Sequence, residues 1–142
     1  MTELASPVTY LDTDKAWDLL ASGQLGRLAV QADVGVDIFP VNYAIDGECI
    51  IFRTAEGAKL SDLMAFGLAT FEVDMWDEQC GYSVIAKGPA TPVRAVEEIA
   101  EVEALHLRPW VPTVKTVFVR ICVTSISARK FEFGPDPIEK YR

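Results

Sequence analysis

Residues 36–54 read VDIFPVNYAIDGECIIFRT, and this stretch decides the fold class. Two runs rich in β-branched and aromatic residues flank Asp46-Gly47, and an Asp-Gly pair is a strong signal for a two-residue hairpin turn. Pro40 cannot donate an amide proton to a strand ladder, so it implies a sheet edge or a bulge in the first run. The stretch therefore predicts an antiparallel hairpin formed by residues 36–45 and 48–54.

Further strand signals lie on both sides of this hairpin. They are residues 26–32, 68–76, 81–94 and 113–133. The third of these runs is expected to break or bend near Gly88-Pro89, and the last to turn around Thr124-Ser125. About six mainly antiparallel strands with short connections favour a barrel, because closure removes exposed sheet edges.

Helices are expected between these strands. Asp12 or Thr13 can cap a first helix, and Gly23 is well placed to end it. A short second helix is predicted over residues 59–66, and a third over residues 96–107, acidic on one side and apolar on the other. The fold class predicted from the residues is mainly β, a barrel with flanking helices.

Composition limits what this fold can do. The length of 142 residues predicts one domain over 1–142, and a hydrophobic content of 50% points to a buried subunit interface. A net charge of −8 argues against nucleic acid and against an anionic membrane surface as partners. A small-molecule ligand is the expected partner.

The metal-binding residue types are too sparse for a metal site. Cys49, Cys80 and Cys122 are far apart, and His106 is the one histidine, so no ligand cluster at short spacing exists. Asp74 and Asp77 are interpreted as charges at a strand end. No secretory signal and no apolar run of membrane-spanning length is visible, so a cytoplasmic protein with reduced thiols is expected.

Residues 52–60, FRTAEGAKL, carry the signal for a ligand. Arg53 and Thr54 end a strand, Gly57 lets the backbone turn, and Lys59 stands where a helix begins. A helix N-terminus attracts anions, and arginine, lysine and threonine add donors for a phosphate group. Phe52 stands where a nucleotide-binding P-loop needs glycine, which argues against a magnesium-nucleotide site. The alternative interpretation is a surface turn with ordinary ion pairs.

Taken with its neighbours, this loop resembles a known family. Residues 40–60 and 69–93 contain PVNY, FRTAEGAKL, FEVD and GYSVIAKG. This series is similar to the pyridoxamine 5′-phosphate oxidase-like, FMN-binding split-barrel proteins of the flavin and deazaflavin oxidoreductase superfamily. The resemblance implies a split β-barrel that forms a homodimer, with flavin sites at the subunit interface.

The resemblance also implies roles for individual residues. It assigns the cofactor phosphate to Arg53, Thr54 and Lys59. It assigns the edge of the isoalloxazine ring to the backbone of Pro40, Val41 and Asn42. It places Tyr82, where the family has tryptophan, and Ser83 at the cofactor across the dimer. Trp110 is expected either to cover the flavin or to fill the dimer core, and His106 to lie at a helix end or on the surface.

The function implied is an FMN-dependent oxidoreductase that transfers hydride at flavin N5 to an unknown small substrate. No side chain is assigned a catalytic role, because the cofactor carries this chemistry. Vitamin B6 oxidation is not favoured, since the substrate-binding C-terminal segment of the oxidases proper is not found. The alternatives are a reductase that uses the deazaflavin coenzyme F420, a non-catalytic flavin carrier, and a cofactor-free dimeric binding module.

Overall fold

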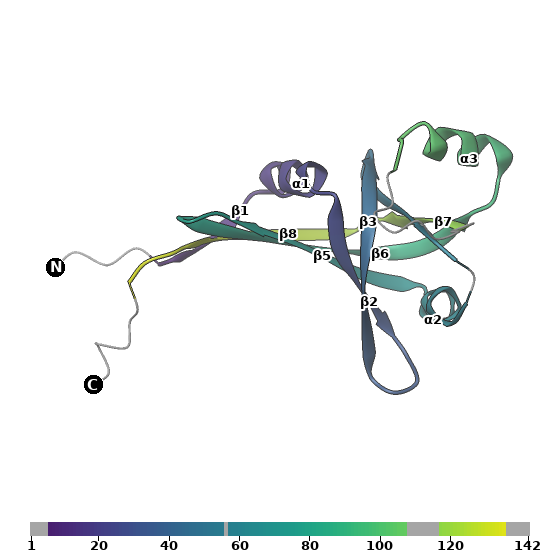
Figure 1. Ribbon diagram of the computed structural model, residues 1–142, viewed down its shortest axis with the longest axis horizontal. Coiled ribbons are helices and arrows are strands. Elements are labelled where there is room, and N and C mark those ends of the chain that lie inside the picture. Colours follow the sequence, from purple (N-terminus) through teal and green to yellow (C-terminus); the bar gives the residue numbers. More distant parts are fainter. Residues whose placement is uncertain (1–5, 56, 108–116, 136–142) are drawn as a thin grey trace.

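The computed structural model describes residues 6–55, 57–107 and 117–135, which form eight strands and three helices (Figure 1). In chain order the elements are β1 (Val8–Leu11), α1 (Thr13–Ser22), β2 (Leu25–Gln31), β3 (Val36–Asp46), β4 (Cys49–Thr54), α2 (Ala58–Phe66), β5 (Leu68–Trp76), β6 (Cys80–Val93), α3 (Val96–Glu103), β7 (Val117–Cys122) and β8 (Ser125–Glu132). None of the described helices is long and apolar enough to cross a membrane.

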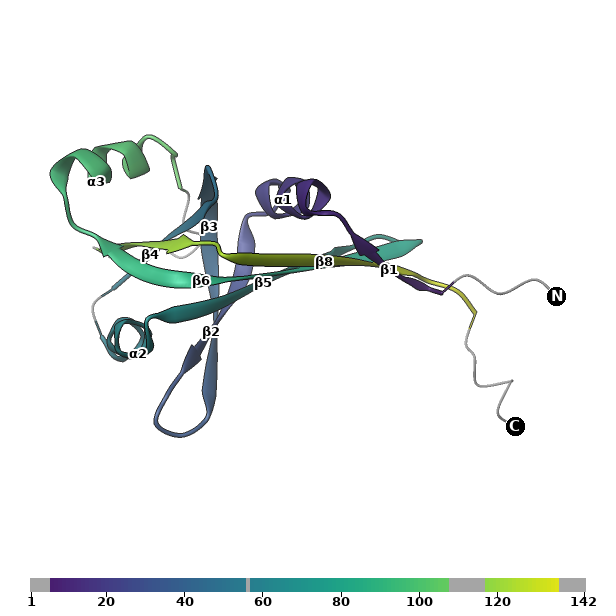
Figure 2. The same cartoon turned by 180° about the vertical axis from the view of Figure 1, so that it is seen from behind.

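The strands form one antiparallel sheet that closes on itself. Their order is β1-β8-β6-β5-β2-β3-β4-β7, and an additional pairing of β6 with β7 closes a barrel of the six strands β2 to β7. β8 and β1 continue from β6 beyond the barrel as an arm, and α1 lies against one face of that arm (Figures 1 and 2). The predicted fold, a mainly β split barrel with flanking helices, is confirmed.

Side chains alternate between the two faces of each strand, and the apolar ones that point inward fill the barrel. Its largest fully buried members include Phe52, Phe71, Leu28 and Ile50. The rings of Tyr43 and Phe71 meet edge to face with centroids 5.0 Å apart, a favourable aromatic geometry. Gly26 lies beside the Phe71 ring, which occupies the space that a β-carbon at this position would need.

The β3–β4 hairpin forms as predicted, but its turn is one residue later. Asp46 pairs with Cys49, so the two turn residues are Gly47 and Glu48 rather than Asp46 and Gly47. Gly47 has φ 60°, which suits a glycine at the first central position of a II′ turn. This register places Tyr43 opposite Phe52, and both side chains are buried.

Pro40 lies at a sheet edge, one of the two placements that its missing amide proton implied. β3 pairs with β2 over residues 36–42 and with β4 only over residues 43–46. Pro40 therefore belongs to a part of the strand that is paired on one side, without a bulge in the register.

β6 is continuous, so of the break or bend expected near Gly88-Pro89 the break does not occur. The strand runs for 14 residues and changes partner instead, from β8 up to Lys87 to β7 from Ala90 (Figure 2). The predicted run 113–133 divides into β7 and β8 near the expected turn at Thr124-Ser125, and its residues 113–116 lie outside the described part of the chain.

The helices agree with the prediction except at one end. Asp12 caps α1 by accepting a hydrogen bond from the Lys15 amide at 2.8 Å, and Gly23 ends this helix. α3 ends at Glu103, four residues before the predicted 107. The apolar pattern continues past this end because Leu105 and Leu107 lie in the turn that follows the helix. There they pack against a small apolar cluster formed by Ile51, Val93, Val102 and Phe118.

Tyr43 links the barrel to α1, because its hydroxyl donates a hydrogen bond to the Leu20 carbonyl. Burial raises the pKa of Tyr43 to about 12. We expect Tyr43→Phe to lower the free energy of unfolding at pH 7 by about 1 kcal/mol, the usual worth of one hydrogen bond. Urea denaturation measures this, and Tyr10→Phe, at a tyrosine that is 76% exposed, serves as the control.

The same tyrosine makes stability depend on alkaline pH. Its folded pKa lies above the ordinary value of 10, so its contribution is complete below pH 10 and is lost as the pH rises toward about 12. Wild-type protein is therefore expected to lose more stability between these two pH values than Tyr43→Phe does. Equal losses in both proteins would show that Tyr43 ionises as freely in the folded state as in the unfolded chain.

Candidate functional site

The strongest candidate site is built around Arg53, near the end of β4. Ile50 and Phe52 belong to the barrel core, whereas Ile51 belongs to a second cluster under α3. Because side chains alternate along a strand, Arg53 shares the outer face with Ile51. Its guanidinium carbon lies 4.6 Å from the centroid of the Phe118 ring, within the range of a cation–π contact.

One donor of Arg53 is left without an acceptor. Its Nε is buried and has no hydrogen-bond partner among the described residues. A buried donor without a partner costs about 1–3 kcal/mol, and such groups are rare in native proteins. The arrangement therefore fits an anionic ligand that supplies the missing acceptor.

A cavity of about 290 Å³ adjoins this guanidinium. It is lined by Arg53, Val102, Glu103, His106, Leu107 and Phe118. A second cavity of about 450 Å³ shares His106 and Leu107 with it and extends along the Tyr43–Ile45 segment of β3. The two adjoining spaces offer room for an elongated ligand with its charged end at Arg53. His106 is exposed and follows α3, as expected for a helix-end or surface residue.

Thr54 and α2 complete the strand end. The Thr54 side chain is only 3% exposed, and its hydroxyl donates to the Ala55 carbonyl at 3.3 Å. Strand alternation places it on the face opposite to Arg53, so these two side chains do not converge. α2 begins after Gly57, which provides no side-chain cap, and Lys59 lies in its first turn with a side chain outside the described atoms. The first-turn amides of α2 are therefore the donors that this loop offers to an anion.

Pro40, Val41 and Asn42 lie on the strand next to Arg53. Tyr43 pairs with Phe52, and the next positions in this register are Asn42 and Arg53. Val41 is buried, and the Asn42 side-chain amide donates to the Gln24 carbonyl at 3.1 Å. The segment therefore begins one position past the last pair between β3 and β4, where β3 is paired with β2 alone.

Tyr82 and Ser83 lie elsewhere, near the start of β6, in the part of this strand that pairs with β8 of the arm. Arg53 pairs with Phe118, which in turn pairs with Val93 at the other end of the same strand. Ten residues separate Ser83 from Val93, so roughly 30 Å of strand lies between Ser83 and the end of β6 that neighbours Arg53. One chain does not bring them together. Trp110 lies outside the described residues.

The arm carries a cleft of its own, of about 300 Å³. Its lining residues are Glu72, Asp74, Met75, Trp76, Gly81, Tyr82, Ser83, Arg129, Phe131 and Phe133. Tyr82 is in addition partly buried against the main core. Ser83 pairs with Asp74 and Arg129, which places it on the arm face away from Tyr82.

Arg27 bridges two carboxylates at the edge of this cleft, a cluster that the sequence analysis missed. Its Nη1 donates to Glu72 at 2.8 Å and to Asp74 at 2.9 Å. Burial, and then the hydrogen bond with Asp74, raise the pKa of Glu72 above its ordinary value despite Arg27. The period-two spacing of the two acids was the available signal, but their common partner on β2 was not visible.

Asp77 takes no part in this cluster. Its Oδ1 accepts hydrogen bonds from the amides of Gln79 at 2.7 Å and Cys80 at 2.9 Å, which fixes the turn between β5 and β6. The interpretation of Asp77 as a strand-end charge is confirmed. Asp74, in contrast, is one of the two carboxylates that accept hydrogen bonds from Arg27.

Comparison with known proteins agrees with this architecture. The family model for pyridoxamine 5′-phosphate oxidase matches residues 12–130. The chain belongs to this family. The matched range contains Arg53 and its neighbours on β3, the start of α2, and the residues of the arm cleft up to Arg129. The resemblance expected from the sequence motifs is confirmed.

Three proteins similar to this chain illustrate the likeness. A Corynebacterium glutamicum protein, provisionally named for this oxidase, is 36% identical with TM-score 0.82, covering 94% of this chain and all of its own. The FAD-binding protein from Mycobacterium smegmatis is 40% identical with TM-score 0.76, covering 89% of this chain and all of its own. An uncharacterized protein of Mycobacterium tuberculosis is 39% identical over 93 residues, 66% of this chain and 84% of that protein.

Proposed function

We propose that this chain binds a flavin nucleotide and acts as a flavin-dependent oxidoreductase on a small molecule. The buried Arg53 Nε without a partner, beside a cavity, is the observation that carries the proposal. A phosphate group would supply the acceptor that this donor lacks, in a charge-assisted hydrogen bond. The 40% identical protein from Mycobacterium smegmatis, which binds FAD, supports a flavin as the ligand.

Each element around Arg53 has a defined task in this proposal. Phe118 holds the plane of the guanidinium, and the first-turn amides of α2 add donors for the phosphate. A ligand with its phosphate at Arg53 would extend into the adjoining cavity, along the Tyr43–Ile45 segment of β3 that follows Pro40–Asn42. When bound, the flavin supplies hydride transfer at its N5 atom. Val102 and Leu107 provide apolar walls at the phosphate end.

We further propose that the functional unit is a homodimer. Within one chain, Ser83 lies roughly 30 Å of strand away from the Arg53 end, so it reaches the site only from a second copy. The open face of the arm supports such pairing, since Tyr10, Trp76 and Phe133 are 76%, 74% and 51% exposed. Exposed aromatic groups of this kind are typical of protein interfaces.

Mild purification followed by an absorbance spectrum and mass analysis of the released small molecule tests the proposal. We expect flavin absorbance bands and a released mass equal to FMN. A mass equal to FAD would place this chain with the Mycobacterium smegmatis protein, and would retain the phosphate contact because FAD contains the same riboflavin phosphate. Light scattering of the same sample is expected to give twice the mass of one chain.

If no cofactor copurifies, titration with FMN, FAD and the deazaflavin coenzyme decides. Binding with oxidation of a reduced nicotinamide supports an enzyme, whereas binding without turnover supports a carrier. Silence with all three ligands would contradict the proposal and leave a cofactor-free binding module.

A further inference from the structure

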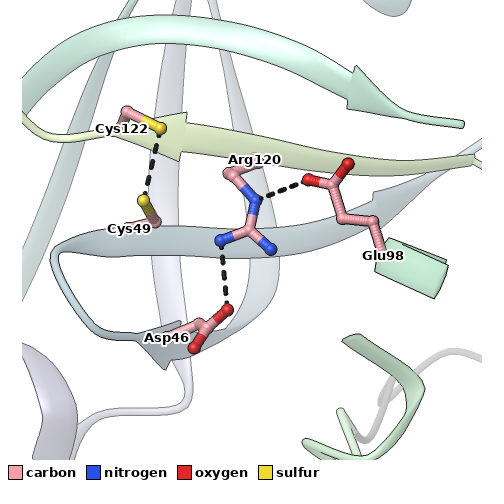
Figure 3. A network of polar contacts seen from close by, with 5 residues as sticks. All are labelled: Asp46, Cys49, Glu98, Arg120 and Cys122. Atoms are coloured by element: carbon pink, nitrogen blue, oxygen red, sulfur yellow. Dashed lines mark hydrogen bonds and ion pairs between the residues drawn. The ribbon is translucent and has the colours of Figure 1, made fainter. Parts of the chain in front are cut away.

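Outside the Arg53 site, two cysteines face each other across neighbouring strands. Cys49 opens β4 and Cys122 closes β7, and the two are direct partners in the antiparallel register. Their sulfur atoms lie 3.3 Å apart, although both thiols are free (Figure 3). In the described part of the chain no comparable thiol pair involves Cys80, which contacts Asp77.

The backbone at this pair has the geometry that a disulfide needs. The amide of Val123 donates to the carbonyl of Glu48 at 3.0 Å, a bond that flanks the cysteine pair on one side. This pattern identifies a non-hydrogen-bonded pair, in which the two α-carbons lie about 4.5 Å apart. Disulfides span α-carbon distances of about 4.4–6.8 Å, a range that includes this spacing.

The surroundings leave the pair accessible to small oxidants. Cys122 is exposed, whereas Cys49 is half-buried at the edge of the cluster under α3. Arg120 lies on the same face, with its Nε bonded to Glu98 at 3.0 Å and its Nη1 to Asp46 at 3.1 Å (Figure 3). The hydrogen bond with Cys49, and then burial, raise the pKa of the Cys122 thiol, while Arg120 acts in the opposite direction. Cys122 therefore rests mainly as a thiol at neutral pH, and its minor thiolate form is the species that reacts with an oxidant.

We propose that Cys49 and Cys122 are a redox modification site that forms a reversible intramolecular disulfide with a peroxide. Cys122, the exposed member, attacks the peroxide as its thiolate, becomes a sulfenic acid and releases one water from hydrogen peroxide. The Cys49 sulfur then displaces the hydroxyl group from Cys122 as a second water. Two thiols and one peroxide thus become one disulfide and two waters. A dithiol reductant reverses the bond by exchange.

Such a bond would tie β4 to β7, two strands of the barrel wall, across the long stretch of chain between them. Closing a long loop restricts the unfolded chain and stabilises the folded one. The inference does not depend on a flavin being bound, because the pair belongs to the strands themselves.

The test oxidises the purified wild-type protein with an equimolar amount of hydrogen peroxide. Free thiols are then counted in denaturant, and linked peptides are identified by mass spectrometry before and after dithiothreitol. We expect the three free thiols to fall to one, a peptide that links Cys49 with Cys122, and full recovery on reduction. The oxidised protein is expected to melt roughly 5–15 °C higher than the reduced protein.

Serine variants at each cysteine complete the design. Cys80→Ser should still lose two thiols, whereas Cys49→Ser and Cys122→Ser should show neither the linked peptide nor the rise in melting temperature. Three unchanged thiols in the wild type would overturn the proposal. A link through Cys80, or stable sulfinic acid on Cys122 alone, would overturn it as well. Because the decisive measurement uses the wild-type chain, a variant that folds poorly does not leave the outcome open.

Discussion

Replacing Arg53 with alanine is expected to raise the dissociation constant for FMN about 10- to 150-fold. The change removes one charge-assisted hydrogen bond to the phosphate, worth about 1.5–3 kcal/mol, and each 1.4 kcal/mol corresponds to a factor of ten. Arg53→Lys keeps the charge but loses the Nε–H and the planar fork, so we expect an intermediate affinity. Flavin fluorescence titration measures all three dissociation constants.

The stability of the ligand-free variant separates binding from folding at this residue. In the ligand-free protein, Arg53→Ala loses the contact with Phe118, worth about 0.5–1 kcal/mol, and also removes the cost of the unpaired buried Nε. Because these two effects oppose each other, we expect the melting temperature of the cofactor-free protein to change by only a few degrees. Lys15→Ala, at an exposed position on α1, controls for the loss of one positive charge. Wild-type affinity in Arg53→Ala would remove the basis of the phosphate site.

Replacing Gly88 with alanine is expected to cost about 3 kcal/mol of folding free energy, at the upper end for overpacking. A β-carbon at this position would lie 2.8 Å from the carbonyl carbon of Cys122 and 3.0 Å from the α-carbon of Val123. Both are backbone atoms, held in place because the Thr124 amide donates to the Lys87 carbonyl at 2.8 Å. Neither strand can yield without losing ladder bonds.

Urea denaturation measures the cost at Gly88, and Gly134→Ala is the matched control. A β-carbon at Gly134 meets nothing within 4 Å, so its substitution is expected to change stability by less than about 0.5 kcal/mol. If both variants unfold at the same urea concentration, the close crossing of β6 by the β7–β8 connection does not constrain the fold.

Local patterns predicted the elements whose signals are contained in a few neighbouring residues. The strand expected at residues 68–76 coincides with β5, because its alternation and its flanking glycine are both local. The hairpin turn was placed one residue early because Asp46-Gly47 fits a turn by itself. The register is decided instead by Tyr43 and Phe52, since a slip of one residue would move both out of the core.

Elements that depend on distant partners were not predictable in this way. β1, only four residues long, was missed because it owes its existence to pairing with β8 at the other end of the chain. The same limit applies to the site. Arg53 is marked by its own loop, whereas its contact with Phe118 and its shielding by α3 depend on the β4–β7 register.

The order in which partners of β6 occur along the chain has a consequence for biosynthesis. β6 pairs on one edge with β5, which precedes it in the chain. Its other edge can pair only after β7 and β8 have been synthesised. While the ribosome adds residues 94–132, that 14-residue edge has open amide and carbonyl groups on a nascent chain. The barrel therefore closes only after β7 has been synthesised, and the interval before closure is when this protein is most exposed to misassembly and to chaperones.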